Sequence, residues 1–374
     1  MVNTDYLPRE TDVLIVGGGP AGLATALAVR QKGLRAVVID SAQPPIDKAC
    51  GEGLMPDSVA ALAKLGVTIN PSRLFAFKGI RFIAPQAQVE ANFPYGTGLG
   101  VRRLALHETL VEHATDAGVH LAWQQRISEV RDSYAFVNDQ PITYRWIVGA
   151  DGGNSIMRRW SGLEIGEKVT PRYGFRRHYR VRPWTEFMEL HWGEECQIYV
   201  TPVNNDEVCV ALISRDPQLR LDEALPRFPA IVRHLQGAEP VNLERGGISA
   251  TRALRAVQKD RLALVGDASG SVDAITGEGL CLAFRQSIAL ADAIGRNDLS
   301  LYEAAHRDIR FRPAMMAQML LLMDRYPALQ SRALRALSNR PRVFARMLAT
   351  HVGAASASDI AANIFELGWS ILNV

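Results

Sequence analysis

Cysteine is scarce in this chain of 374 residues, which contains only four. No two of them form a CxxC pair, and none lies near a histidine at zinc-finger spacing. Neither a disulfide framework nor a metal site is therefore expected, and the thiols are expected to be reduced. The four are Cys50, Cys196, Cys209 and Cys281.

Excess charge and long apolar runs are also missing. The net charge of +3 is too small for the clustered basic face that nucleic-acid binding normally requires. No uninterrupted apolar run approaches the roughly 18 residues that span a bilayer. Because Met1–Asp5 also lacks the basic start of an export signal, we expect a cytoplasmic protein without a nucleic-acid partner.

The composition that remains is that of a soluble globular protein, with 48% hydrophobic and 22% charged residues. The length exceeds one ordinary core and suits two domains. No internal repeat or low-complexity linker divides the chain, so the two domains are expected to be interleaved by several crossings.

The first forty residues contain one βαβ unit. Thr11–Val16 has the composition of a buried strand, Ala21–Gln31 that of a helix, and Arg35–Ile39 that of a second strand. Elements in this order indicate a parallel sheet.

A glycine-rich turn joins the first strand to the helix. Gly17 permits the tight turn, Gly19 lets the backbone approach a pyrophosphate, and Gly22 allows the helix to pack closely on the sheet. Asp40 lies about twenty residues further on, where its carboxylate can accept hydrogen bonds from ribose hydroxyls. The pattern predicts bound FAD or NAD rather than NADP, and a glycine-rich turn without a ligand is the alternative.

Two later segments decide between these cofactors. Val148–Arg158 resembles the ADGxxSxxR segment of flavoprotein hydroxylases, and Leu264–Ala268 resembles their GD segment, whose aspartate holds a ribityl hydroxyl. Over most of residues 10 to 300 the chain resembles the FAD-dependent oxidoreductases of the p-hydroxybenzoate-hydroxylase-like superfamily, on the side of the geranylgeranyl reductases and flavin halogenases.

Three more segments carry the same resemblance. Asp47–Leu54 is similar to the reductase loop over the flavin, Val272–Leu280 to the loop beside the isoalloxazine, and Arg103–His107 to an RxxLH segment whose arginine contacts FAD. The fingerprint and the resemblance together imply these FAD contacts: Gly17, Gly19, Pro20, Ala21, Gly22, Asp40, Ser41, Lys48, Gly51, Arg103, Asp151, Gly266, Asp267, Gly277, Gly279 and Leu280.

The loop at Gly277 and Gly279 also has a physical argument of its own. A helix predicted to begin at Leu280 would point free N–H groups and its positive dipole end at the flavin, stabilising the anion of the reduced ring. An ordinary glycine-rich helix start is the alternative.

The predicted fold is α/β with an α+β second domain: a Rossmann-type FAD-binding domain interleaved with a smaller, mostly antiparallel substrate domain, plus C-terminal helices. The FAD-binding domain takes residues 1–70, 99–165 and 255–300, the substrate domain 71–98 and 166–254, and the helical segment 301–374. Further elements are predicted as helices at 56–65, 104–117 and 221–235 and as strands at 120–130, 145–148 and 261–265.

Candidate catalytic and substrate residues cluster near these loops. Cys50, Glu52 and Glu278 are candidate catalytic groups beside the flavin, although inert packing and solvated carboxylates are the alternatives. The strand Arg176–Tyr179 should turn alternate side chains toward the substrate or toward the surface. From it and from the following strands we select Arg177, Tyr199 and Pro202 as substrate residues.

The motifs indicate the cofactor more clearly than they indicate the type of reaction. Gly270 and Ala274 replace the histidine and proline usual in aromatic hydroxylases, and the reductase segment YxWxFP survives only as Ile198–Val203. We predict a monooxygenase of an apolar or aromatic small molecule, with NADH or NADPH as a transient donor. The alternatives are a reductase of C=C bonds in a lipid-like, geranylgeranyl-type substrate and a flavin-retaining binding protein without turnover.

The tail beyond residue 301 combines arginines with a methionine- and leucine-rich face. Such helices usually cap a core, and contact with a membrane or an acidic, acyl-bearing partner is the alternative. The arginines are Arg307, Arg310, Arg312, Arg325, Arg332, Arg335, Arg340, Arg342 and Arg346.

Overall fold

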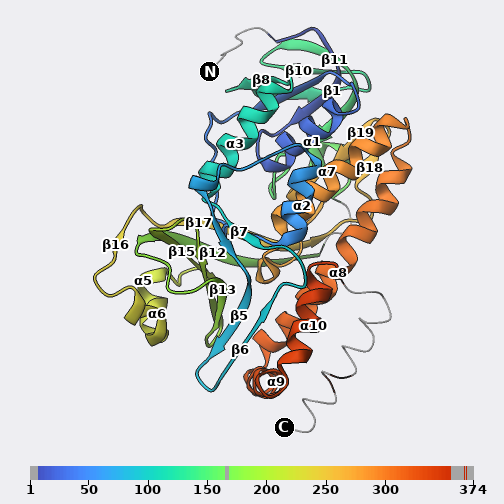
Figure 1. The fold of residues 1–374 in the computed structure, drawn as a ribbon. Helices are drawn as coiled ribbons and strands as arrows, with labels where there is room; N and C mark the ends of the chain where they lie inside the picture. The colour runs from blue at the N-terminus through green and yellow to red at the C-terminus, as the bar shows by residue number, and fades with distance from the viewer. Residues whose placement is uncertain (1–6, 165–167, 355–365, 367, 369–374) are drawn as a thin grey trace.

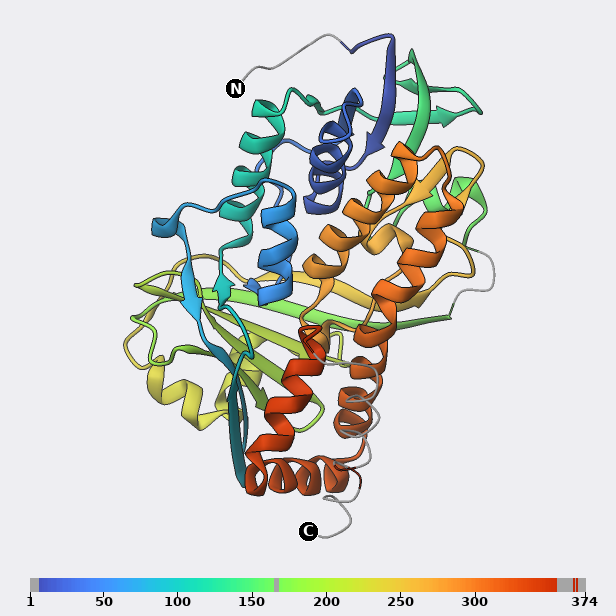
Figure 2. The same cartoon turned by 45° about the vertical axis from the view of Figure 1, so that its right-hand side comes forward.

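The computed structural model describes residues 7–164, 168–354, 366 and 368. Two large sheets lie one above the other, joined by a small three-stranded sheet and flanked by helices (Figures 1 and 2). The predicted fold class is confirmed.

The first sheet is the Rossmann sheet, with strand order β18-β19-β11-β1-β2-β8. Its five central strands are parallel, and β18, β9 and β10 extend it with antiparallel pairs. The strands are β1 (Glu10–Val16), β2 (Ala36–Asp40), β8 (His120–Trp123), β9 (Ile127–Val130), β10 (Tyr134–Val137), β11 (Gln140–Gly149), β18 (Gln258–Lys259) and β19 (Leu262–Leu264). All lie within the ranges predicted for the FAD-binding domain.

Helices cover both faces of the first sheet. On one face α1 packs against both α3 and α7, around a core that includes Leu23, Leu110 and Phe284. On the other face Met157 of α4 shares a second hydrophobic core with Leu14. The helices are α1 (Pro20–Arg30), α2 (Pro56–Lys64), α3 (Arg103–Asp116), α4 (Ile156–Ser161) and α7 (Gly279–Gly295).

The second sheet is mostly antiparallel, with strand order β16-β12-β15-β14-β13-β5-β6 and β17 beside β12. Its members are β5 (Gly79–Ala84), β6 (Ala87–Asn92), β12 (Lys168–Arg180), β13 (Phe187–Trp192), β14 (Cys196–Pro202), β15 (Glu207–Ser214), β16 (Glu239–Pro240) and β17 (Arg245–Ala253). The small sheet of β3 (Gly53–Leu54), β7 (Gly98–Gly100) and β4 (Phe75–Phe77) lies where the chain crosses between the two large sheets.

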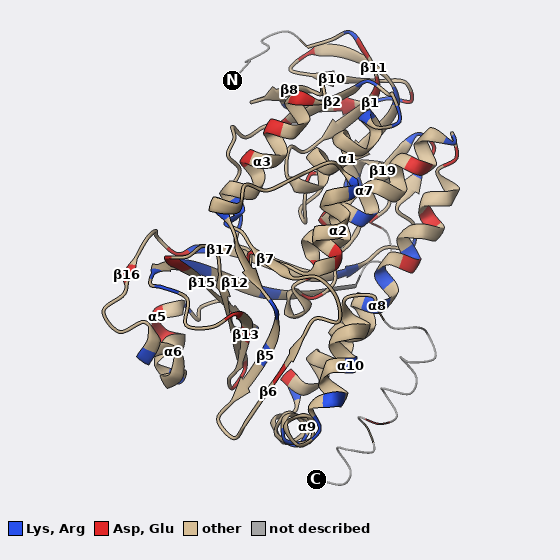
Figure 3. Ribbon diagram, in the orientation of Figure 1, with Lys and Arg blue, Asp and Glu red and all other residues tan. Residues whose placement is uncertain are grey.

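Three C-terminal helices pack on the second sheet: α8 (Ser300–Arg325), α9 (Pro327–Asn339) and α10 (Pro341–His351). Their apolar faces join the core of β5, β6 and β13, as Met316, Leu337 and Phe344 illustrate. Figure 3 shows acidic as well as basic residues along α8. Among the described residues, no helix has the length and apolar character needed to cross a bilayer.

Two predicted elements are broken in the structure. The strand expected at 120–130 divides into β8 and β9 because Gln124 adopts a left-handed backbone with φ 58°. The helix expected at 221–235 divides into α5 (Leu221–Ala224), a short 3-10 turn and α6 (Pro229–His234). Pro226 and Pro229 cannot donate the hydrogen bonds that a continuous helix needs.

Candidate functional site

A cavity of about 690 Å³ lies between the two large sheets, and we call it the central cavity. It is lined by the ends of first-sheet strands, the starts of α1 and α7, the segment 46–53 and one face of the second sheet. Fifteen of the sixteen predicted FAD contacts line it: Gly17, Gly19, Pro20, Ala21, Asp40, Ser41, Lys48, Gly51, Arg103, Asp151, Gly266, Asp267, Gly277, Gly279 and Leu280.

The glycine-rich turn has the geometry of a phosphate-binding loop. Gly17 has φ 114°, and a Cβ on it would lie 2.4 Å from the carbonyl oxygen of Ala150. The missing contact, Gly22, serves packing instead, because its Cβ would lie 1.8 Å from the oxygen of Gly17. No described side chain caps the N-terminus of α1, whose first residues line the cavity. Its free N–H groups are therefore available to an anion.

Asp40 closes the same turn from β2. Its Oδ2 accepts a hydrogen bond of 2.6 Å from Gly18 N, and its Oδ1 accepts one of 2.8 Å from Ala42 N. The carboxylate is thus held at the cavity wall with lone pairs remaining for a ribose.

The two aspartate segments meet through a buried arginine. Arg158 donates to the carbonyl oxygens of Gly153 at 2.7 Å and of Ala268 at 3.2 Å, which ties the DG segment to the GD segment. Asp267 lies 2.7 Å from Lys48 Nζ, and the Lys48 charge lowers the pKa of its carboxyl group. An ionised acceptor and an ammonium group therefore face the cavity together.

These residues fit FAD. Among the described residues that line the cavity, three buried polar atoms have no hydrogen-bond partner: Nε of Arg103, Nε of Arg176 and Oδ1 of Asp151. In the part of the chain that the structure describes, nothing lies within 4 Å of a Cβ placed on Gly19 or Gly279, so both helix starts are open to a ligand. A cavity with uncapped helix N-termini, an ionised aspartate and unpaired hydrogen-bonding atoms suits a dinucleotide.

The second sheet supplies the apolar wall of the central cavity. Met188, Tyr199, Ala211 and Ile213 line it from three neighbouring strands. The Tyr199 hydroxyl donates to the oxygen of Ile275, and burial raises the pKa of this phenol. Tyr199 therefore faces the cavity as a neutral, hydrogen-bonded ring.

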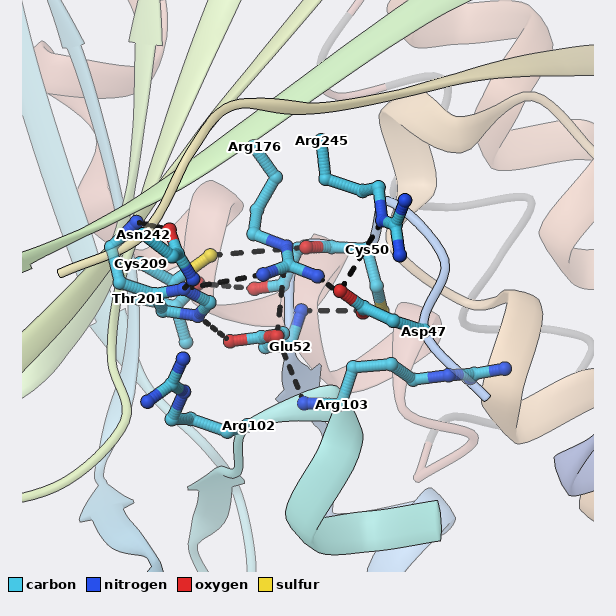
Figure 4. A network of polar contacts seen from close by, with 12 residues as sticks. Asp47, Cys50, Glu52, Arg102, Arg103, Arg176, Thr201, Cys209, Asn242 and Arg245 are labelled. Atoms are coloured by element: carbon cyan, nitrogen blue, oxygen red, sulfur yellow. Dashed lines mark hydrogen bonds and ion pairs between the residues drawn. The ribbon is translucent and has the colours of Figure 1, made fainter. Parts of the chain in front are cut away.

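A buried polar network joins this wall to the segment 46–53 (Figure 4). Glu52 Oε2 lies 2.6 Å from His178 Nε2, and both side chains are fully buried. Arg176 donates to Asp47 Oδ1 at 2.5 Å, and its Nε lies 3.8 Å from Glu52 Oε1. The network therefore connects the two domains at the cavity.

Cys50 lies in the same segment and lines the cavity. Burial, as the largest cause, raises the pKa of its thiol, while Arg103 opposes that shift. Its Sγ accepts a hydrogen bond of 3.3 Å from Glu52 N. At neutral pH the thiol is therefore protonated.

Glu278, predicted beside the flavin, points away from the cavity. Its buried carboxyl group lies near Asp57 and Cys281, and its Oε2 lies 3.6 Å from His351 Nδ1. Burial raises the pKa of Glu278 well above its usual value and lowers that of His351. Both groups are therefore neutral behind the loop that lines the cavity.

Two predicted substrate residues do not line the cavity, whereas Tyr199 does. Arg177 faces the opposite side of β12 and pairs with Asp222 at 2.6 Å. Pro202 contributes its backbone to packing near Gly100, not a side chain to the cavity. The side chains of Arg176–Tyr179 alternate between the two faces of β12 as predicted, but Arg176 and His178, not Arg177, face inward. Arg176 lines the cavity and His178 bonds to Glu52.

Several contributors were not predicted from the sequence, among them Asp47 and Asn242 in the network and Gln125 and Arg126 on the cavity wall. Gln125 and Arg126 follow Gln124, where the predicted strand breaks. No local motif marks these positions, because their role depends on how distant segments meet.

Glu52, His178 and Cys209 also have the residue types of a metal site, with ligand atoms within 4.8 Å of one another. Their geometry, however, is that of side chains hydrogen-bonded to one another and not that of metal ligands. Glu52 and His178 are in direct contact at 2.6 Å, and the charge of Arg176 lies beside the carboxylate. A cation there would displace the hydrogen bond and be repelled by the guanidinium.

Comparisons with known proteins agree with this site. The sequence model of the family described as FAD binding domain matches residues 10–296. The chain is 26% identical over 347 residues to menaquinone reductase of Mycobacterium tuberculosis, covering 85% of each protein. It is also 26% identical over 310 residues to digeranylgeranylglycerophospholipid reductase of Methanococcus vannielii, covering 74% of this chain and 75% of the relative.

Among solved structures, a flavoprotein/dehydrogenase from Cytophaga hutchinsonii superposes with a TM-score of 0.83. The superposition covers 97% of this chain and 98% of that one at 17% identity. These matches confirm the superfamily predicted from the sequence motifs.

Proposed function

Because the chain belongs to the FAD binding domain family, we propose that it is an FAD-dependent reductase that saturates carbon–carbon double bonds in an apolar, isoprenoid-type lipid. NADH or NADPH would bind transiently, without a protein domain dedicated to it, and reduce the flavin. Both relatives described above are reductases, and their names denote lipids that carry isoprenoid chains.

The observation that carries the proposal is the protonated Cys50 thiol at the wall of the cavity, beside Arg103 and Arg176. Saturation of a double bond requires a hydride at one carbon and a proton at the other. Bound FAD, once reduced, supplies the hydride. Cys50 holds a proton at Sγ, and Arg103 and Arg176 lie close enough to stabilise the thiolate that remains. Solvent would return the proton after product release.

The other residues bind, orient and exclude water. Met188, Ala211 and Ile213 offer an apolar wall to a hydrocarbon chain. Lys48 and Asp267 would hold the polar part of the cofactor, and the starts of α1 and α7 would face its charged groups. The apolar wall limits the access of water to the reacting carbons.

The monooxygenase predicted from the sequence needs the same cofactor and a similar apolar cavity, so product analysis separates the two reactions. We expect the holoenzyme with NADH or NADPH and a geranylgeranyl lipid, mixed without oxygen, to yield a product heavier by two hydrogen atoms. A product formed only with oxygen, and heavier by one oxygen atom, would support the monooxygenase instead.

The variant Cys50→Ala tests the proton donor. We expect the donor to bleach its flavin as in the unaltered protein, while lipid reduction falls by about 10²-fold. Unchanged lipid reduction would refute the role of Cys50. A flavin that neither donor bleaches, with lipid present, would leave only the binding protein without turnover.

A further inference from the structure

The second sheet contains a buried histidine that the proposed reaction does not use. His178 of β12 is fully enclosed, and its Nε2 lies 2.6 Å from Glu52 Oε2. Its Nδ1 lies 2.7 Å from Asn242 Nδ2 and 3.2 Å from Arg176 Nη1. In Figure 4, Asn242, Arg176 and Glu52 converge on one point from separate segments.

The partners of His178 determine which of its nitrogens carries the proton. Asn242 Oδ1 accepts a hydrogen bond of 3.1 Å from His178 N, so the amide nitrogen of Asn242 is the atom that faces Nδ1. This amide and Arg176 Nη1 are both donors, so Nδ1 accepts. The imidazole is therefore neutral and carries its proton on Nε2, directed at Glu52.

The partners of Glu52 determine its charge by the same reasoning. Oε2 accepts from His178, and Oε1 accepts a hydrogen bond of 2.8 Å from Arg103 N. Because both oxygens accept, the carboxyl group is ionised, and the nearby Arg176 guanidinium compensates its charge. In this arrangement Glu52 is an anchored anion and not a proton donor.

Glu52 in turn shapes the backbone that carries Cys50. Glu52 has φ 60°, a left-handed conformation that costs a side-chain-bearing residue free energy unless its surroundings hold it. Its N–H donates to Cys50 Sγ at 3.3 Å, and its carbonyl oxygen accepts from Val101 N at 2.9 Å. Thr201 also donates to the oxygen of Gly51 at 2.7 Å.

We propose that His178, oriented by Asn242 and Arg176, is a positioning residue that anchors Glu52 as an anion and thereby holds the Cys50 thiol at the cavity. Its effect on turnover rests on the proposed function. The state of the thiol can be measured without any substrate, so a failure of this inference is distinguishable from a failure of the proposed function.

Four groups surround the thiol: Glu52 in its own segment, Arg103 from α3, Arg176 from β12 and Cys209 from β15. Apart from burial, the charge of Glu52 raises the pKa of Cys50, whereas Arg103 and Arg176 lower it. If Glu52 loses its charge, the two arginines act unopposed and the thiolate becomes more stable. If His178 cannot donate, the buried carboxylate loses the hydrogen bond that holds its charge in place beside the thiol.

The test is the pH dependence of Cys50 alkylation by iodoacetamide in the FAD-loaded protein, followed by mass spectrometry of the Cys50 peptide. We expect Glu52→Gln to move the alkylation midpoint down by about one pH unit. His178→Phe should move it in the same direction, and the double variant should move it no further, because both changes act through one carboxylate. His178→Gln retains an N–H donor and should restore most of the unaltered profile.

Tyr179→Phe is the matched control, because Tyr179 is on the same strand but faces away from Glu52. It should leave the midpoint unchanged. With lipid substrate, His178→Phe should lower kcat about tenfold and change KM by less than about twofold. An unchanged midpoint in Glu52→Gln, or additive shifts in the double variant, would overturn the proposal. So would one equivalent of tightly bound zinc in the purified protein, since His178 would then be a ligand.

Discussion

Two glycines of the same turn serve different purposes. A Cβ on Gly22 would lie 1.8 Å from the backbone oxygen of Gly17, whereas a Cβ on Gly19 would have nothing within 4 Å. Gly22 is therefore required by the fold itself, and Gly19 leaves space that only a ligand would fill. The fingerprint GxGxxG thus combines a packing requirement with a binding requirement.

This difference predicts opposite effects of substitution. Gly19→Val should leave the free energy of unfolding nearly unchanged but remove bound FAD, because the side chain extends into the cavity. Gly22→Ala should destabilise the protein by about 1–3 kcal/mol through the clash with the backbone. Urea unfolding and the visible absorbance of the purified proteins measure the two effects. Retained yellow colour in Gly19→Val would contradict the cofactor site.

Glu278 predicts a dependence of stability on pH. Burial raises its pKa in the folded chain well above the usual 4.5, so folding favours its protonated form. The contribution of such a carboxyl group to the free energy of unfolding is fully present below about pH 4.5. It is lost as the pH rises toward the folded-state pKa.

Glu278→Gln preserves the neutral shape without the ionisation. We expect it to raise the free energy of unfolding at pH 8 by on the order of 1 kcal/mol, with little gain at pH 5. Thermal unfolding at both pH values measures the difference. Equal effects at pH 5 and pH 8 would exclude a titrating carboxyl group at this position.

The cofactor residues could be predicted from the sequence because their roles depend on local backbone geometry. Wherever a strand, a glycine-rich turn and a helix follow one another, the local backbone fixes the positions of residues such as Gly17 and Gly19. The choice of Arg177 depended on which face of β12 points inward, and Arg176 occupies that face. The partners of Glu52 could not be predicted, since His178 lies 126 positions away and no spacing rule connects the two.

Among the secondary-structure elements, the predicted bounds agree best with the structure where a periodic hydrophobic pattern is ended by residues that break it. The helix beginning at Pro20 and the strand ending at Val16 fall within one residue of their predicted positions. The failures lie at 120–130 and 221–235, where a left-handed Gln124 and two prolines interrupt otherwise suitable patterns. Hydrophobic periodicity alone does not detect such interruptions.

The packing of α8 on the second sheet includes a buried ion pair that the sequence did not reveal. Arg172 of β12 lies 2.7 Å from Asp324 of α8, and both side chains are almost fully enclosed. Gln197 bonds to both of them, and Arg172 Nε lies 4.0 Å from Asp273 in the loop beside the cavity. The C-terminal helices are therefore connected to the cavity by charge as well as by apolar contact.

Removing one partner of this pair should be costly. Asp324→Ala leaves the Arg172 charge buried without its closest counter-ion, and we expect it to destabilise the protein by about 3–5 kcal/mol. Gln318→Ala, at an exposed position of the same helix, serves as the control and should change stability by less than about 0.5 kcal/mol. Similar urea midpoints for the two variants would show that Asp324 contributes little to the docking of α8.

At the scale of the whole molecule, the two sheets cannot be separated into consecutive pieces of chain. The first sheet uses residues 10–149 and 258–264, while β5 and β6 leave it to join the second sheet. The central cavity lies between these interleaved parts and takes its walls from both. The absence of a linker in the sequence predicted this interleaving, but composition could not indicate which faces would meet.

A cofactor bound between interleaved domains should stabilise them as one unit. We expect the apoprotein to unfold in a single transition, and the midpoint to rise as FAD is added. At a free FAD concentration about 100 times Kd, the free energy of unfolding should increase by about 2.7 kcal/mol. Tryptophan fluorescence reports on both parts, since Trp146 is in the first sheet and Trp192 in the second. Two separate transitions, of which FAD shifted only one, would mean that the cofactor contacts the first domain alone and that the wall formed by Met188, Tyr199 and Ile213 is not coupled to it.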